Sequence, residues 1–161
     1  MDTRTYEFSP VAKMLFGYTD PCPYETAQSY GHALICIAGA DEEVSQEEMD
    51  WLTKFYAYTM GVPKDLVAAW ESFDFRKGNL EEILKSLGGV PVNFKKSLIY
   101  DAIRMSSADG YVHREKLSVY KAAELLGIDK KTVAMLECLV EVELSLRKQV
   151  ALMLEVPSAH V

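Results

Sequence analysis

The chain has 161 residues, of which 49% are hydrophobic and 25% are charged, so it is long enough to bury the core of one globular domain. Leu, Ala, Met and Glu are plentiful while Gly and Pro are scattered, and this composition favours helices. Every apolar stretch is shorter than the roughly 18 residues of a membrane-spanning helix, and the N-terminus lacks the pattern of a secretory signal. We therefore expect a cytoplasmic protein without direct membrane insertion.

The net charge of −7 comes almost entirely from one stretch, residues 41–50, which reads DEEVSQEEMD. This stretch holds 6 of the 24 acidic residues, and the rest of the chain has 18 acidic residues against 17 basic ones. Nucleic-acid binding requires clustered Lys and Arg. The charge distribution therefore argues against a nucleic-acid partner and indicates a local acidic surface.

Capping residues divide the chain into helices. Ser9 and Pro10 are typical of a helix start, Ser45 and Glu48 form an S-x-x-E capping box, and Gly61 ends the helix that this box begins. No stretch has the alternating pattern of a β-strand. The predicted helices, in chain order, cover residues 10–17, 25–40, 46–60, 63–72, 79–87, 91–107, 114–126 and 129–155.

The last predicted helix is long, and its later part carries an apolar stripe of Leu146, Val150, Met153 and Leu154. Two interpretations stay open. The stripe packs against the N-terminal helix in the core, or it forms the contact of a homodimer through the C-terminal helix.

The three cysteines are an odd number at long spacings without a C-x-x-C pair, so neither a disulfide framework nor a zinc knuckle is indicated. Cys36 and Cys138 lie in apolar helical runs. We expect both to be buried as small hydrophobic side chains.

An internal repeat appears when the chain is shifted by 68 residues. The shift aligns ADEEVSQEEMDWL (40–52) with ADGYVHREKLSVY (108–120), and after a two-residue gap the match continues with MGVPKDLVAAW (60–70) against LGIDKKTVAML (126–136). We therefore expect a single all-α domain over residues 1–161, a compact bundle of about seven to eight helices built from two pseudo-repeated units. The units span about 26–72 and 92–140, followed by a C-terminal helix extension over 141–156.

The repeat places the same loop, A-D-x-x-V-x-x-E, before a helix in each unit. Asp41 and Asp109 are suited to an Asx-turn, in which the carboxylate accepts a backbone N–H two residues on. We expect Val44 and Val112 to anchor the two loops in the core. A glutamate then follows in the first turn of the next helix, where its charge interacts favourably with the helix dipole.

Paired A-D-G-[IV]-x-x-E units that each close on L-G-[IV] resemble the tellurite-resistance TerB-like family. The resemblance covers residues 26–140 and is clearest in SADGYVHREKLSVYKAAELLGI, the second unit. It implies a small all-α protein of bacterial tellurite and chemical-stress resistance, and the family's members are not established enzymes. It also implies a cytoplasmic module linked to metal sensing and to protein partners in a membrane-associated stress-resistance complex.

The resemblance also implies which acidic positions matter. In this chain they are Asp41, Glu47 and Glu48 in the first unit, and Asp109 and Glu115 in the second. The chain departs from the family pattern at Glu42, which replaces a Gly, and at His113 and Lys116. Two equivalent cation sites are therefore not expected.

Three functions compete on these residues. The first is a divalent-cation site, because hard cations prefer several oxygen ligands, and His113 would add a nitrogen ligand for zinc. The second is an interaction module whose acidic patch docks a basic protein partner with no metal bound. A purely structural interpretation, in which the carboxylates cap helices, remains beside both. The candidate ligands are Asp41, Glu43, Glu47, Asp109, Glu115 and His113.

The third function is catalysis, which the sequence supports poorly. The phosphate-loop, G-x-S-x-G and H-E-x-x-H motifs do not occur. His32 and Cys36 lie four residues apart on one predicted helix and form the nearest approach to a nucleophile and base. We expect a non-enzymatic protein in which this pair belongs to the core. Beyond a divalent cation, no cofactor is expected.

Overall fold

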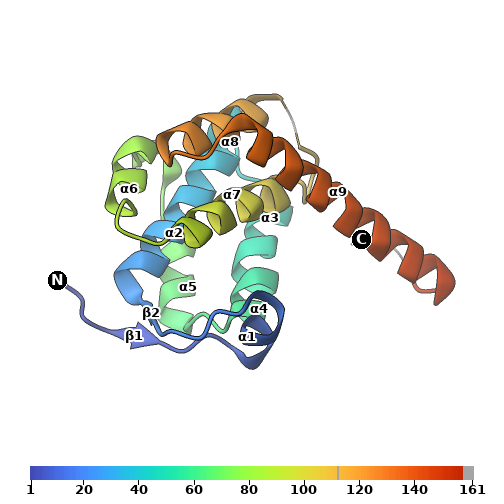
Figure 1. Ribbon diagram of the computed structural model, residues 1–161, viewed down its shortest axis with the longest axis horizontal. Helices are drawn as coiled ribbons and strands as arrows, with labels where there is room; N and C mark the ends of the chain where they lie inside the picture. The colour runs from blue at the N-terminus through green and yellow to red at the C-terminus, as the bar shows by residue number, and fades with distance from the viewer. Residues whose placement is uncertain (112, 158–161) are drawn as a thin grey trace.

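The computed structural model describes residues 1–111 and 113–157, and it confirms the all-α class. In Figure 1, α2 and α7 run through the middle of the molecule, and the other helices surround them. Val112 and His160 lie outside the described residues, so the predicted anchoring of Val112 is not described. The helices are α1 (Pro10–Phe16), α2 (Tyr24–Ala38), α3 (Gln46–Asp50), α4 (Ala57–Met60), α5 (Lys64–Glu71), α6 (Leu80–Ser86), α7 (Val92–Ser106), α8 (His113–Leu125) and α9 (Lys130–Met153).

Helix α2 is the centre of the core, and it packs against α5, α6, α7 and α8. Its close contact with α5 depends on Gly31, because a Cβ atom there would lie 2.1 Å from Trp70 Nε1. The Trp70 indole is buried and donates a hydrogen bond of 3.3 Å to the Ala27 carbonyl oxygen. The absence of a side chain at one position therefore lets the largest core residue reach the central helix.

The predicted helix starts are confirmed by their caps. Ser9 Oγ accepts the Ala12 N–H, and Asn79 accepts the Glu82 N–H. The capping box of Ser45 and Glu48 is present in both directions. These agreements follow from the local nature of capping, which needs only side chains within one helical turn.

The helix predicted over 46–60 is continuous but contains a π-helical turn, η2 (Trp51–Tyr56), between α3 and α4. Its end at Gly61 is confirmed, since this residue has a φ of 77°. The π-helical turn presents Trp51 and Phe55 to the guanidinium of Arg104, at 5.4 and 5.6 Å from the ring centroids. This segment directly follows α3, the helix that carries Glu48.

A short antiparallel strand pair was not predicted. Strand β1 (Thr5–Tyr6) pairs with β2 (Cys22–Pro23), and the segment between them carries α1. Two-residue strands are too short to show an alternating pattern. Their pairing is fixed by contacts distant in sequence, so the local pattern does not reveal it.

Helix α9 contacts the body from its N-terminal end as far as Arg147. Val133 and Val140 are buried, Glu143 pairs with Arg104, and Arg147 lies against the Phe55 ring. The C-terminal end of the helix extends away from the body (Figure 1). The predicted burial of Cys138 is wrong, because this cysteine lies on the solvent side of α9 and is exposed.

The predicted packing of the C-terminal stripe against the N-terminal helix is also wrong, since all four side chains of the stripe are exposed to solvent. Their exposed fractions are 59% for Leu146, 47% for Val150, 83% for Met153 and 69% for Leu154.

None of the described helices is long and apolar enough to cross a membrane.

Candidate metal centre

Two inter-helix loops meet beside the C-terminal ends of α2 and α7. The first continues from α2 through the 3-10 turn η1 (Gly39–Asp41) to α3, and the second joins α7 to α8. Helix α8 packs against both η1 and α2, which brings the loops together. Glu48 and Glu115 are each the third residue of the helix that follows their loop. Their carboxyl groups therefore lie at the point where the two loops meet.

Glu48, Asp109 and Glu115 form an acidic cluster. One carboxylate oxygen from each residue lies within 4.8 Å of the other two. Glu48 is 2% exposed and Glu115 is 1% exposed, whereas Asp109 is exposed at the rim. Among the described residues, this is the group in which three or more His, Cys, Asp or Glu side chains approach closely enough to hold one ion.

The two oxygens of Glu48 have different surroundings. Oε1 accepts the Ser45 N–H at 2.9 Å and so completes the capping box. Oε2 is buried, and a hydrogen-bonding contact with the Glu115 carboxyl group contributes to the raised pKa of Glu48. Two carboxyl groups can share a hydrogen bond only when one of them carries a proton, and a buried acceptor without a donor costs about 1–3 kcal/mol. The pair therefore requires a proton or a cation.

The electrostatics of the cluster also favour a bound positive charge. Burial raises the pKa of Glu48 above its usual value, and the hydrogen bond from Ser45 only partly opposes this shift. The negative charges of Glu115 and Asp109 raise the pKa further. The pair of buried glutamates therefore resists being fully ionised unless a cation balances the charge.

The structure distributes the predicted ligands unevenly. Asp109 and Glu115 belong to the acidic cluster, whereas Asp41, Glu43, Glu47 and His113 do not. Asp41 forms the expected Asx-turn, with Oδ1 accepting the Glu43 N–H at 3.2 Å. The other three side chains outside the cluster are exposed: Glu43, Glu47 and His113.

Sequence reasoning left Glu48 out of the candidate ligands because the ungapped repeat aligned Glu47 with Glu115. Counting from the helix starts gives a different match, since α3 begins at Gln46 and α8 at His113. The first loop is one residue longer, and Glu42 adopts a left-handed φ of 76° within it. The capping box was the signal for Glu48, because the same third helical position in α8 is Glu115.

A second group of buried charges joins α7 to α2 and α9. Asp101 accepts a hydrogen bond of 2.6 Å from the Tyr30 hydroxyl and forms an ion pair of 3.3 Å with Arg104. Arg104 also pairs with Glu143 of α9 at 2.8 Å. Burial raises the pKa of Asp101 to about 6, although Arg104 and Tyr30 act in the opposite direction. These partners account for the buried charges, so this group is structural.

The His32 and Cys36 pair lacks the features of a catalytic nucleophile and base. The His32 ring stacks on Phe73 with a centroid distance of 3.9 Å, and burial lowers the pKa of His32. Burial raises the pKa of the Cys36 thiol to about 11. Reactive cysteines have a lowered pKa, so the surroundings of this thiol favour the unreactive form.

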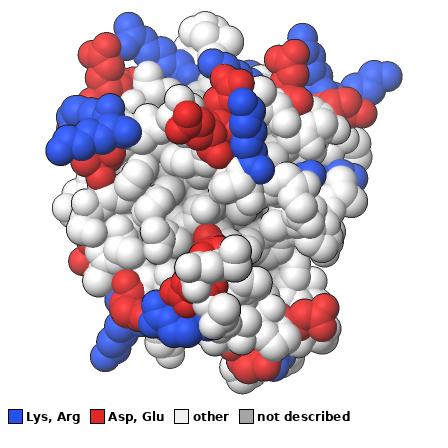
Figure 2. Space-filling view, turned by 90° about the vertical axis from the view of Figure 1, so that its left-hand side faces the viewer, with Lys and Arg blue, Asp and Glu red and all other residues white. Residues whose placement is uncertain are grey.

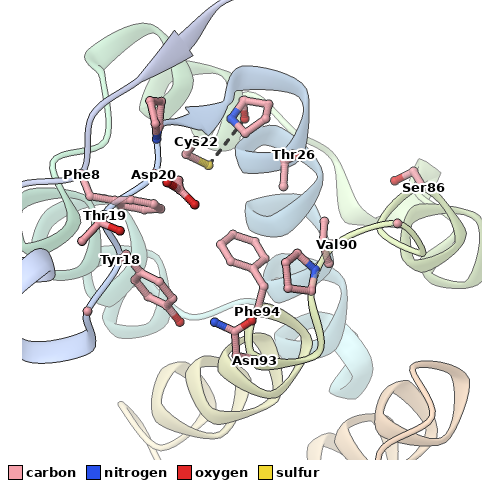
Figure 3. Close-up of a pocket in the computed structure, with 15 residues that line it drawn as sticks. Phe8, Tyr18, Thr19, Asp20, Cys22, Thr26, Ser86, Val90, Asn93 and Phe94 are labelled. Carbon is pink, nitrogen blue, oxygen red and sulfur yellow. Dashed lines mark hydrogen bonds between the residues drawn. The ribbon is translucent and has the colours of Figure 1, made fainter.

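A pocket of about 520 Å³ lies between the N-terminal ends of α2 and α7 (Figure 3). Phe8, Tyr18 and Phe94 form aromatic walls, and Asp20 and Cys22 add polar groups. Since the acidic cluster follows the C-terminal ends of the same two helices, the pocket and the cluster are separate sites. Burial raises the pKa of Cys22, so its thiol is not an activated nucleophile.

Basic and acidic side chains are mixed on the surface shown in Figure 2. Figure 2 shows one face of the molecule, on which basic side chains lie beside acidic ones around a largely uncharged centre. This face has no large patch of positive charge of the kind that tracks a nucleic-acid backbone.

The fold is an all-α bundle in which two acidic inter-helix loops meet. No family model matches the chain, and no curated protein matches it significantly. Among solved structures, it is similar to the crystal structure of a tellurite resistance protein from Nostoc punctiforme, with a TM-score of 0.75 and 27% sequence identity. The match covers 92% of each chain. It confirms the resemblance to the tellurite-resistance TerB-like family, which is not a known enzyme family.

Proposed function

We propose that this protein is a non-enzymatic module of a tellurite or chemical-stress resistance system, and that it binds a divalent cation through Glu48, Asp109 and Glu115. The likeness to the Nostoc punctiforme protein supports the biological context. The observation that carries the proposal is the acidic cluster, in which a buried glutamate oxygen without a donor faces two further carboxylates.

The spacing of the cluster suits a calcium-sized ion. Calcium–oxygen distances of about 2.3–2.6 Å allow two ligands of one ion to lie up to roughly 5 Å apart. The three carboxylate oxygens lie within 4.8 Å of one another, so they are close enough to approach one such ion. Magnesium requires shorter distances of about 2.0–2.1 Å, so its binding would draw the three groups closer.

The ligand chemistry favours hard cations over zinc. All three groups in the cluster are carboxylates, and His113 is exposed outside it. Carboxylate ligands suit calcium, magnesium and manganese, whereas nitrogen and sulfur ligands favour zinc. We therefore propose that the cluster binds calcium or manganese more tightly than magnesium. Zinc should bind less tightly here than at a site that contains histidine.

A cation at this position would replace a proton. Because the pKa of Glu48 is raised, the carboxyl groups keep a proton at higher pH than exposed glutamates do. A cation must displace that proton, so affinity is expected to increase as pH rises. The bound ion would join the start of α3 to the start of α8.

The exposed carboxylates outside the cluster support a second candidate function. Glu42, Glu43 and Glu47 are all exposed, and Glu42 makes only a long ion pair of 3.8 Å with Arg114. These charges would steer a basic protein partner, either beside a bound cation or without one. A cytoplasmic location and a partner in a membrane-associated complex are part of this proposal.

Titration calorimetry on chelator-treated protein with calcium, magnesium, manganese and zinc tests the cation site. We expect binding by the unaltered protein, loss of binding in Glu48→Gln and Glu115→Gln, and retention in the matched control Glu47→Gln. Glu47 is the exposed neighbour of Glu48 on the same helix. Absence of heat at millimolar metal would overturn the cation proposal and leave the basic-partner function.

A basic partner has its own signature. Exposed charges steer association less strongly as salt rises, because counterions screen them. A partner held by Glu42, Glu43 and Glu47 should therefore bind more slowly at high salt. Salt-independent association in a surface-binding assay would contradict this second candidate.

A further inference from the structure

Helix α9 presents an apolar face to solvent along most of its length, from residue 135 to residue 153. Apolar side chains recur on it at spacings of three or four residues, which keeps them on one side of a helix. The opposite side of α9 carries the buried residues that hold it to the body. The exposed face consists of Met135 (67%), Leu139 (54%), Val142 (63%), Leu146 (59%), Val150 (47%) and Met153 (83%).

The spacing of this apolar face is symmetric about Leu146. Val142 and Val150 lie four residues on either side of it, and Leu139 and Met153 lie seven residues on either side. Reversing the direction of the helix about Leu146 therefore superimposes apolar positions on apolar positions. Offsets of four and seven residues keep these positions on one face of the helix, so an antiparallel copy would meet apolar side chains along the contact.

We propose that α9 pairs with α9 of a second copy of this chain in an antiparallel homodimer whose two-fold axis passes beside Leu146. In that arrangement Leu146 meets Leu146 of the second copy, and Val142 meets its Val150. Each body contacts its own α9 as far as Arg147, on the side opposite the apolar face, and leaves the C-terminal end of the helix projecting (Figure 1). The antiparallel direction therefore places the two bodies at opposite ends of the helix pair.

The area of the apolar face suits a second copy. Burying one aliphatic side chain removes roughly 60–120 Å² of apolar surface from water. Reversal about Leu146 pairs five of the six side chains, because Met135 falls opposite Pro157, beyond the end of α9. The five offer roughly 300–600 Å² per copy, or about 600–1,200 Å² in the pair. Weak and transient interfaces bury less than about 1,200 Å², so the face suits a weak dimer.

The polar residues beside the face fit the same partner. Glu143 lies outside this contact, because its carboxylate pairs with Arg104 and Arg147 on the side of α9 that faces the body. Helices that lie on membrane surfaces carry Lys and Arg on their polar side, whereas residues 141–153 of α9 carry two acidic residues, Glu141 and Glu143, beside two basic ones, Arg147 and Lys148. A second copy suits this charge pattern better than an anionic lipid surface.

Sedimentation equilibrium of the full chain tests the dimer. We expect self-association across roughly 1–100 μM, the range suited to a small interface. Leu146→Glu should give a monomer with an unchanged far-UV circular dichroism spectrum, because Leu146 makes no core contact. The matched control is Leu152→Glu, since Leu152 is 74% exposed but lies on a different side of α9. A monomer throughout this range, or equal effects of the two variants, would overturn the proposal.

Cysteine crosslinking tests the antiparallel direction in a Cys138→Ser background, which removes the exposed native thiol. Leu146→Cys should crosslink to itself under mild oxidation. Val142→Cys alone should not, whereas a mixture of Val142→Cys and Val150→Cys chains should form the mixed disulfide, since bridged Cα atoms must lie within about 7 Å. Self-crosslinking of Val142→Cys would indicate a parallel pair and overturn the proposed arrangement.

Discussion

Replacing Glu48 with Gln separates the two roles of this side chain. The amide oxygen of Gln can still accept the Ser45 N–H and preserve the capping box. Its NH₂ group replaces the oxygen that has no donor among the described residues, and it can donate to the neighbouring carboxylates. We therefore expect Glu48→Gln to stabilise the metal-free protein while abolishing cation binding.

The magnitude follows from the cost of the buried acceptor. Relieving it should raise the free energy of unfolding by about 1–3 kcal/mol at about pH 8. The folded-state pKa of Glu48 lies above its usual value of 4.5, so the folded state binds more protons than the unfolded state. The free energy of unfolding of the unaltered protein is therefore greatest below the usual pKa of 4.5, and it decreases as pH rises through the folded-state pKa of Glu48. The advantage of Glu48→Gln should shrink toward zero at acidic pH.

Urea unfolding of both proteins between about pH 4.5 and pH 8, with chelator and with saturating calcium, measures these effects. Calcium at about 100 times its dissociation constant should add about 2.7 kcal/mol to the unaltered protein and nothing to the variant. Glu47→Gln serves as the control and should change neither quantity. Equal or lower stability of Glu48→Gln at about pH 8 in chelator would refute the reasoning about the buried carboxyl pair.

Two further predictions concern the core. Arg104→Met should lower the free energy of unfolding by about 3–5 kcal/mol, because it leaves the buried Asp101 without its cation. The loss should be larger at about pH 7 than at about pH 5, where protonation of Asp101 relieves it; a pH-independent loss would contradict this account. Gly31→Ala should lower the thermal midpoint by several degrees, since its Cβ would overlap Trp70 and overpacking costs about 1–3 kcal/mol. An unchanged midpoint would show that the indole moves freely.

The helices and their boundaries could be predicted from the sequence because their signals are local. A serine cap, a capping box or a left-handed glycine acts within one turn, as Ser9, Ser45 and Gly61 show. The strand pair and the π-helical turn could not be predicted in this way. They depend on contacts between distant segments, such as Tyr24 N–H to Arg4 O at 3.0 Å.

The candidate site could be predicted only in part. The sequence identified the two loops and both Asp109 and Glu115, because the repeat aligned them with acidic residues. It left out Glu48, since one additional residue in the first loop shifts the helix start relative to the aspartate. The exposure of the apolar side chains of α9 could not be predicted either. The same apolar sequence pattern occurs whether a helix packs against its own core or against another molecule.

The continuous helix from Gln46 to Met60 has a mechanical consequence. Its first turn carries Glu48 in the acidic cluster, and its π-helical turn places Phe55 against Arg147 of α9, with 5.2 Å between the guanidinium carbon and the ring centroid. The same continuous helix therefore contacts both the acidic cluster and α9. A change in the tilt of this helix would change the direction of α9 relative to the rest of the molecule.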